Sequence, residues 1–238
     1  YLGDSDYFPV PVSELMDSTY LAERIKDFNF YRITPGISSG IINVYEPGET
    51  THYSVVDKDR NAVAVTTTLN DSFGSRVVVA GSGFFLNNEM DDFSIKPGFR
   101  NLFGLTGGKA NAIEPGKRML SSMTPSIIEK DGELYFVLGS PGGSRIITTV
   151  FQVILNVINN DMTLPDAVSA PRFHHQGIPD TLFYEYPRIS GPAMEALRQM
   201  NYFLIPVESM GRVNAILVNG STLAGAADPR GDDGAAGF

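Results

Sequence analysis

Two neighbouring stretches alternate apolar and polar positions and predict a β-hairpin. The stretches "THYSVV" (51–56) and "NAVAVTTTL" (61–69) are rich in β-branched residues, and the polar run "DKDRN" separates them. This pattern is typical of half-buried strands. If the turn is centred on Asp59, Thr50 lies opposite Thr68, and opposed side chains share one face of a sheet about 5 Å apart. The pattern therefore predicts two facing threonine hydroxyls.

Later stretches predict two more hairpins and two helices. "SIIEKDGELYFVLG" has the turn pair Asp131-Gly132 between two apolar runs, and "NAILVNGSTLAGAA" has a similar turn near the C-terminus. The apolar run of "SPGGSRIITTVFQVILNVINN" follows a glycine turn and is long enough to favour a buried helix over a strand. A further helix is expected near Pro192–Met200. Hairpins separated by helices predict an α+β fold rather than a parallel doubly wound sheet.

The N-terminal part has a different pattern. Residues 1–31 predict a proline-punctuated loop and then a short amphipathic helix, because Leu15, Leu21 and Ile25 lie near helical spacing. Residues 32–49 are rich in glycine, proline and serine and predict a connector. We therefore expect a boundary between residues 1–49 and residues 50–238. Residues 96–108, "KPGFRNLFGLTGG", predict a mobile surface loop.

Composition narrows the possible partners. The 238 residues carry a formal net charge of −9, which disfavours nucleic acid and anionic membrane surfaces as partners. The chain has no cysteine, so disulfides and thiolate nucleophiles are excluded. No apolar run has the length of a membrane span. The chain begins without an initiator methionine or a signal peptide, and we expect it to be part of a longer protein.

Thr50 could act as a nucleophile if it became an N-terminal residue. A threonine hydroxyl alone is a poor nucleophile, but a free α-amino group on the same residue can serve as its base. The pKa of an α-amino group, about 7.7–8.0, suits proton transfer near neutral pH. This chemistry requires cleavage of the Glu49–Thr50 bond, which an N-to-O acyl shift in the preceding "PGE" turn could achieve. The other interpretation is β-propensity alone, which the alternation itself favours.

Six ordered motifs resemble the small subunit of γ-glutamyltransferases, which are N-terminal-nucleophile (Ntn) hydrolases related to capsule depolymerases and cephalosporin acylases. The motifs are "TTHYSVVDKDRNAVAVTTTLNDSFG", "FLNNEMDDFSIKPG", "KRMLSSMTP", "GSPGGSRIITT", "APRFHHQ" and "AADPR". "YLGDSDYFPVPVSEL" resembles the end of the large subunit of the family. The resemblance implies a four-layer αββα sandwich, partial here because the upstream large-subunit part is absent. It also implies a processing linker up to residue 49 and a catalytic subunit from residue 50.

The resemblance assigns the catalytic groups. Thr50 matches the self-processing residue and nucleophile, and Thr68 matches the threonine that hydrogen-bonds it. Gly142 and Gly143 match the oxyanion hole, a role that suits glycines because their backbone N–H groups can approach a reacting carbonyl. The start of the following helix also favours negative charge. Without the motif, two glycines before a helix indicate only a flexible turn.

The resemblance also assigns a donor site. Asn70, Glu89 and Asp92 match positions that bind the α-amino end of a glutamyl donor, and Ser121 and Ser122 match the pair that binds its α-carboxylate. Without the motif, the acidic residues would indicate a solvent-exposed surface, and the two serines would indicate a turn or a helix cap. The family's arginine for the α-carboxylate lies upstream, outside this chain. Two departures affect the details, because Phe103 stands where some relatives have tyrosine and Glu89 where some have glutamine.

The implied activity is γ-glutamyl transfer or hydrolysis. The donor would be glutathione or a related amide, and the acceptor would be water, an amino acid or a peptide. The rest of the large subunit would be a partner, and the family habit is a periplasmic or extracellular location. One alternative is a poly-γ-glutamate depolymerase. Another is an Ntn amidase such as a β-lactam acylase, which the donor residues disfavour. A third is an inactive fragment or a binding module.

Other motifs predict less. "GISSG" (36–40) fits the serine-hydrolase pattern G-x-S-x-G, but it follows a Pro-Gly and precedes a β-branched run, which is the wrong context for that elbow. His174 and His175 are adjacent and would point to opposite faces of a strand, and His52 is the only other histidine. We therefore expect no metal and no cofactor.

Overall fold

The computed structural model describes residues 2–33, 50–177 and 180–237. Its central sheet has the order β3-β4-β8-β9, with every pair antiparallel. The strands are β3 (Ser126–Lys130), β4 (Glu133–Gly139), β8 (Asn214–Asn219) and β9 (Thr222–Ala226). Both predicted hairpins are therefore confirmed, and they join side by side through β4 and β8.

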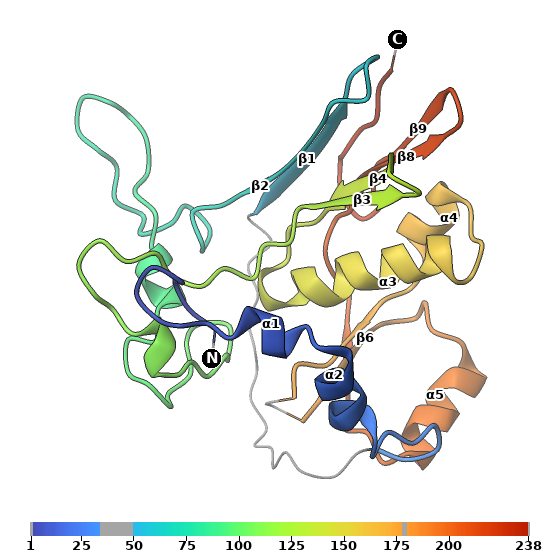
Figure 1. Ribbon diagram of the computed structural model, residues 1–238, viewed down its shortest axis with the longest axis horizontal. Coiled ribbons are helices and arrows are strands. Elements are labelled where there is room, and N and C mark those ends of the chain that lie inside the picture. Colours follow the sequence, from blue (N-terminus) through green and yellow to red (C-terminus); the bar gives the residue numbers. More distant parts are fainter. Residues whose placement is uncertain (1, 34–49, 178–179, 238) are drawn as a thin grey trace.

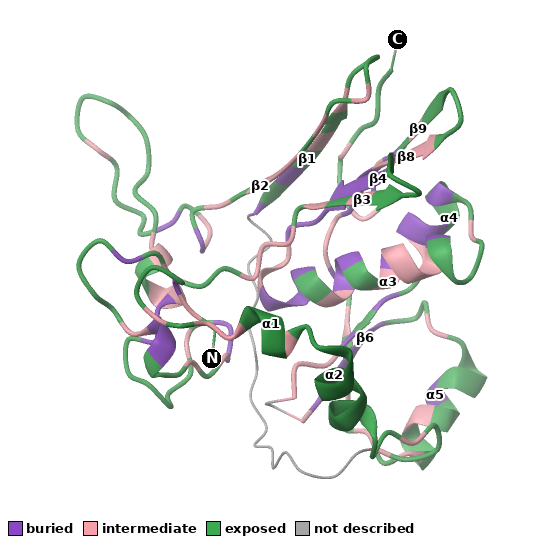
Figure 2. Ribbon diagram, viewed as in Figure 1, coloured by how far each residue is buried: buried purple, intermediate pink, exposed green. Residues whose placement is uncertain are grey.

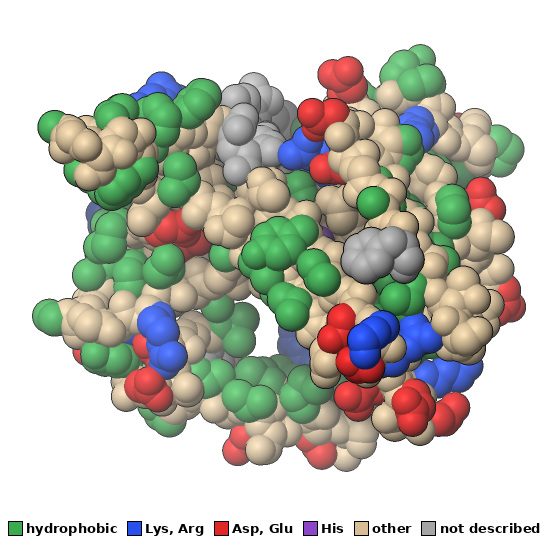
Figure 3. All heavy atoms as spheres, turned by 90° about the horizontal axis from the view of Figure 1, so that it is seen from above, with side chains coloured by type: hydrophobic (Ala, Val, Ile, Leu, Met, Phe, Trp, Pro, Cys, Tyr) green, Lys and Arg blue, Asp and Glu red, His purple; other side chains and the backbone are tan. Residues whose placement is uncertain are grey.

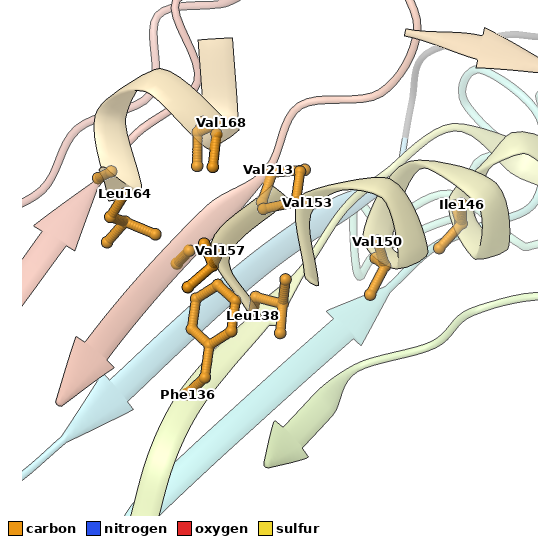
Figure 4. Packing of buried hydrophobic residues seen from close by; sticks show 12 residues of the cluster. Phe136, Leu138, Ile146, Val150, Val153, Val157, Leu164, Val168 and Val213 are labelled. Atoms are coloured by element: carbon orange, nitrogen blue, oxygen red, sulfur yellow. The ribbon is translucent and has the colours of Figure 1, made fainter. Parts of the chain in front are cut away.

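The main core lies between this sheet and the helices α3 (Ile146–Ile158) and α4 (Leu164–Ser169). Val150, Val153 and Val157 of α3 are buried, and Figure 4 shows them against Phe136 and Leu138 of β4. Ile147 and Phe151, on the other side of α3, are exposed. The apolar run after the glycine turn is thus the predicted buried helix, while the six-residue α4 was not predicted.

The first hairpin covers the opposite face of the central sheet (Figure 1). It consists of β1 (Thr51–Val56) and β2 (Ala62–Thr67), which pair antiparallel with Thr51 opposite Thr67. Asn214 of β8 connects the two layers, because its Nδ2 donates to the backbone oxygen of His52 at 3.1 Å. Since β4 is covered on both faces, its last residues are all buried and lack the alternation of a surface strand.

A third sheet was not predicted. It contains β5 (Phe173–His174), β6 (Leu182–Glu185) and β7 (Leu204–Val207), with β5–β6 antiparallel and β6–β7 parallel. The predicted helix α5 (Gly191–Gln199) connects the parallel pair and buries Met194 against Leu182 and Tyr184. The fold is mixed α and β, as expected, although it includes one parallel pair.

The N-terminal segment forms two short helices, α1 (Val12–Leu15) and α2 (Ser18–Ile25), where the pattern predicts one. Asp17 separates them and caps α2, because its side chain accepts a hydrogen bond from Tyr20 N at 2.9 Å. Neither helix has a buried residue, as Figure 2 shows. The predicted boundary within 32–49 falls largely outside the described residues.

Residues 70–125 contain two short 3₁₀ helices, η1 (Glu89–Asp92) and η2 (Lys109–Asn111), and a third, η3 (Gly143–Arg145), precedes α3. The segment 96–108 is a loop, as predicted, but Phe103 within it is buried. Asn101 holds the loop together, because its Oδ1 accepts from Phe103 N and Leu105 N at 3.1 and 2.9 Å. None of the described helices has both the length and the apolar character to span a membrane.

Candidate active site

The threonines that the alternation places opposite each other are hydrogen-bonded. Thr50 is 5% exposed, and its Oγ1 donates to Thr68 Oγ1 at 3.1 Å. The backbone N–H of Asn70 donates to the same Thr68 oxygen at 2.9 Å. The predicted register is therefore confirmed, and Thr68 fixes the direction of the Thr50 hydroxyl.

Asn70 connects this threonine pair to η1. Its backbone is in the left-handed region, with φ of 77°, which asparagine tolerates better than most residues. The buried Asn70 side chain donates to Asn88 O at 3.2 Å, immediately before Glu89. Asn88 N donates in return to Leu69 O at 3.1 Å. The end of the nucleophile hairpin and the predicted ammonium-binding acids therefore form one hydrogen-bonded unit.

Glu89 and Asp92 are half-buried and lie one helical turn apart in η1. Burial, then the charge of Asp92 and a hydrogen bond with it, raise the pKa of Glu89 to about 7. Burial and the charge of Asp91 raise the pKa of Asp92 to about 6. Within the described part of the chain, neither carboxyl group forms a salt bridge with a lysine or arginine. The arrangement is suited to a positively charged ligand.

The turn between β4 and α3 carries Gly142 and Gly143 with φ of 131° and 53°, in the region that favours glycine. A Cβ atom at Gly142 would lie 3.4 Å from the Cα of Gly211. Among the described residues, neither glycine N–H has a hydrogen-bond acceptor, and η3 and α3 follow directly. Two free N–H groups at the start of a helix can bind a developing negative charge.

Ser122 connects the predicted carboxylate site to this turn. Its Oγ donates to Gly143 O at 3.1 Å, and the neighbouring Ser121 Oγ accepts from Met123 N at 3.1 Å. The structure therefore brings Ser122 against the candidate oxyanion hole. It leaves the Ser122 oxygen's lone pairs and the Ser121 hydroxyl proton available to a ligand.

A cavity of about 540 Å³ includes part of the predicted donor site. Asp92, Ser121 and Ser122 line it, whereas Asn70 and Glu89 do not. The other lining residues are mainly apolar, with two cations at positions 96 and 100. Figure 3 shows the surface hollowed beside groups of hydrophobic side chains. The cavity can therefore hold a ligand with both polar and apolar parts.

His174 and His175 each lie in a hydrogen-bonded pair rather than in a metal site. His174 Nδ1 lies 2.7 Å from Thr148 Oγ1, and His175 Nε2 lies 2.9 Å from Asp180 Oδ1. The described residues contain no group of three or more His, Cys, Asp or Glu side chains that could hold a metal ion. The "GISSG" motif lies outside the described residues.

A buried charge network was missed by the sequence analysis, although Arg172 lies in the motif "APRFHHQ" and Asp228 and Arg230 lie in "AADPR". Arg172 Nη2 donates to Asp228 Oδ2 at 2.6 Å, and Arg230 Nη2 donates to Glu185 Oε2 at 2.6 Å. The network also binds the loop behind the oxyanion turn, because Arg172 Nη1 donates to Met210 O at 2.6 Å. The arginines in these two motifs were the available signal.

The model of the gamma-glutamyltranspeptidase family matches residues 1–238. The chain is 51% identical over 234 residues to the glutathione hydrolase proenzyme of Pseudomonas aeruginosa, covering 97% of this chain and 42% of the relative. It is 48% identical over 243 residues to the glutathione hydrolase proenzyme of Escherichia coli, covering 100% of this chain and 42% of the relative. The chain thus spans about two-fifths of the length of these relatives.

Among solved structures, a threonine-to-alanine mutant of the gamma-glutamyltranspeptidase of Helicobacter pylori is 55% identical to the chain, with a TM-score of 0.74. The match covers 76% of this chain and 100% of that one. The gamma-glutamyltranspeptidase of Pseudomonas nitroreducens in complex with L-DON is 54% identical, with a TM-score of 0.76, and the match covers 79% of this chain and 99% of that one. These structures share the Ntn-hydrolase fold that the motifs imply.

Proposed function

The chain belongs to the gamma-glutamyltranspeptidase family. We propose that its parent protein matures by cleavage before Thr50 and then transfers or hydrolyses γ-glutamyl groups. The donor is glutathione or a related γ-glutamyl amide. The acceptor is water, an amino acid or a peptide. The observation that carries the proposal is the buried Thr50 hydroxyl, which donates to Thr68 Oγ1 at 3.1 Å.

In the proposed reaction, the free α-amino group of Thr50 accepts the proton of the Thr50 hydroxyl as Oγ1 attacks the γ-carbonyl carbon. The carbonyl oxygen becomes an oxyanion, to which the N–H groups of Gly142 and Gly143 donate. The C–N bond then breaks, and the leaving amine takes the proton from the Thr50 ammonium. A γ-glutamyl ester remains on Oγ1. Water or an acceptor amine attacks this ester, and the Thr50 oxygen regains a proton.

Donor recognition is proposed to divide between two polar groups. The carboxyls of Glu89 and Asp92 bind the donor's α-ammonium, which supplies the positive charge that their half-buried site lacks. The hydroxyls of Ser121 and Ser122 bind its α-carboxylate. Because Ser122 Oγ also donates to Gly143 O, the carboxylate site and the oxyanion hole are held in a fixed relation. The remaining part of the large subunit is proposed to supply a cation for the same carboxylate.

Intact mass and N-terminal sequencing of the full precursor test self-processing. We expect the wild-type protein to give two pieces, the second beginning Thr-Thr-His-Tyr, and Thr50→Ala to give one uncut chain. Thr51→Ala is the matched control, because Thr51 is the adjacent residue but its side chain is exposed. That variant should still be cut before Thr50. An uncut wild-type protein, or a cut Thr50→Ala protein, would contradict the proposal.

Turnover of a γ-glutamyl anilide by the same proteins tests the chemical step. Loss of the nucleophile in Thr50→Ala should lower turnover by at least about 1,000-fold. Thr51→Ala should keep most of the wild-type rate. We also infer from the family resemblance that the parent protein is exported to the periplasm or the medium, and fractionation of the native host would test this location.

A further inference from the structure

His52 is a buried side chain that lies between two strands of different sheets. It is 3% exposed, on the inward face of β1. A Cβ atom built on Gly139 of β4 would come within 3.0 Å of the ring atoms Cε1, Nδ1 and Nε2 of His52. The imidazole therefore lies directly against the Gly139 backbone, and only glycine leaves room for it there.

Hydrogen bonds hold the ring in this orientation from both sides. Nδ1 lies 2.8 Å from Thr66 Oγ1, and Nε2 lies 3.0 Å from Ser54 Oγ. Ser54 Oγ donates onward to Asn214 O at 3.3 Å, so its lone pairs can accept a hydrogen bond from the Nε2–H group. Burial lowers the pKa of His52 to about 4, so the ring is neutral at physiological pH. A neutral ring with both nitrogens hydrogen-bonded is a rigid spacer rather than a proton carrier.

The contact lies close in sequence to both parts of the candidate active site. His52 follows Thr50 by two positions, so the two side chains share a face of the hairpin. Their opposed partners, Thr66 and Thr68, also face that way. Gly139 ends β4 and is followed within a few residues by Gly142 and Gly143. One ring therefore separates the strand that carries the nucleophile from the strand that leads to the oxyanion hole.

We propose that His52 is a positioning residue that, by lying against Gly139, sets the distance between the Thr50 hydroxyl and the N–H groups of Gly142 and Gly143. This inference rests on the proposed function of that site. The attacking oxygen and the oxyanion donors act on the two ends of one carbonyl group, so their separation has little tolerance. A misplacement of about 1 Å can lower a rate by about 100-fold.

A double-mutant cycle on the full precursor tests the contact, with Gly139→Ala, His52→Ala and the paired variant. In Gly139→Ala the added methyl group displaces the ring, and we expect kcat for a γ-glutamyl anilide to fall by about 100-fold. In the paired variant the methyl group occupies space that the ring has left. We therefore expect kcat to recover by about 10-fold over Gly139→Ala, so the two effects are not additive.

Two further readouts separate positioning from general damage to the fold. KM for the donor should change by less than about 3-fold in all three variants, because none of them alters the groups proposed to bind it. His52→Asn keeps a polar group near Thr66 but is too short to hold the strands apart, so it should lose kcat as His52→Ala does. Gly191→Ala is the matched glycine control, because a Cβ there has no atom within 4 Å.

Three results would overturn the proposal: additive losses in kcat, a rise in KM in place of a fall in kcat, or wild-type kcat in His52→Ala. If Gly139→Ala fails to mature, recovery of maturation in the paired variant supports the contact, and failure of both variants overturns it. A wild-type protein without γ-glutamyl turnover would instead contradict the proposed function. The same cycle would then be measured on the rate of cleavage before Thr50, which uses the same hydroxyl.

Discussion

Two pairs of acidic side chains in this molecule are in opposite electrostatic states. Glu185 and Asp228 are almost fully buried, and burial alone would raise the pKa of each. The hydrogen bonds and charge of Arg230 outweigh burial at Glu185, and the charge of Arg172 does so at Asp228, so both pKa values are lowered. At the half-buried Glu89 and Asp92, burial and neighbouring negative charge act together, and both pKa values are raised.

Burial by itself therefore does not decide the ionisation state of a carboxyl group. The more deeply buried pair is ionised because two arginines lie within hydrogen-bonding distance. The less buried pair has no such partner among the described residues. The first pair is complete and stabilises the fold, while the second requires a cation from outside to be fully ionised at neutral pH.

Breaking the complete pair should have the largest effect. Arg172→Met leaves Asp228 buried without its shortest ion pair, and removal of one partner of a buried pair costs about 3–5 kcal/mol. Denaturant unfolding would measure the loss in the free energy of unfolding. Arg198→Met is the control, because its ion pair with Glu195 is exposed and contributes less than about 1 kcal/mol. Equal losses in the two variants would contradict this interpretation of the network.

Removing charge from the incomplete pair should mainly affect binding of the donor. Asp92→Asn removes one partner of the proposed ammonium contact, which corresponds to about 1.5–3 kcal/mol, or about 10–100-fold in KM. Glu89→Gln should have a smaller effect, since some relatives are expected to have glutamine there. The measurement is KM for a γ-glutamyl anilide and for a glutaryl anilide, which lacks the α-amino group.

The glutaryl anilide supplies the internal control for this prediction. Its KM should be nearly the same in the wild-type protein and in Asp92→Asn, because there is no ammonium group for the carboxylate to bind. If both substrates lose affinity equally, Asp92 acts on the shape of the site rather than on the charge of the donor. The ammonium role proposed for the pair would then be wrong.

The sequence predicted the parts of the site that depend on local pattern. Strand alternation and the turn at Asp59 placed Thr50 opposite Thr68, and the length of the apolar run predicted α3. The pattern did not predict strands that are short and covered on both faces. An example is β6, whose four residues are all buried and show no alternation. The six-residue α4 is likewise too short to show a helical period.

Charge states and long-range contacts could not be predicted from the sequence, for a different reason. The raised pKa values of Glu89 and Asp92 depend on how far the folded chain buries them and on which cations remain distant. From the sequence, His52 was considered only as a poor metal ligand. Its contact with Gly139 could not be predicted, because the contact exists only once the hairpin lies over the central sheet. Such features require the tertiary structure, whatever the strength of the motif.

The smallest effect should be on the pH dependence of stability. The pKa values of Glu89 and Asp92 are raised on folding to about 7 and about 6, so the folded protein holds protons that the unfolded chain releases. Their contribution is fully present below about pH 4 and is lost as the pH rises through 6 to 7. Glu185 and Asp228 have lowered pKa values, so their contribution is present at neutral pH and is lost as the pH falls.

Unfolding at pH 5 and at pH 8 distinguishes the two pairs. A Glu89→Gln/Asp92→Asn variant should be more stable than the wild-type protein at pH 8, because it has no half-buried charge to accommodate. The gain should be below about 1 kcal/mol, since both carboxyls are partly exposed and solvent screens them. At pH 5 the difference should be clearly smaller, because the carboxyls of the folded wild-type protein are then mostly protonated. A stability difference that is the same at both pH values would show that Glu89 and Asp92 are already compensated, which would remove the reason for expecting them to bind the donor's ammonium.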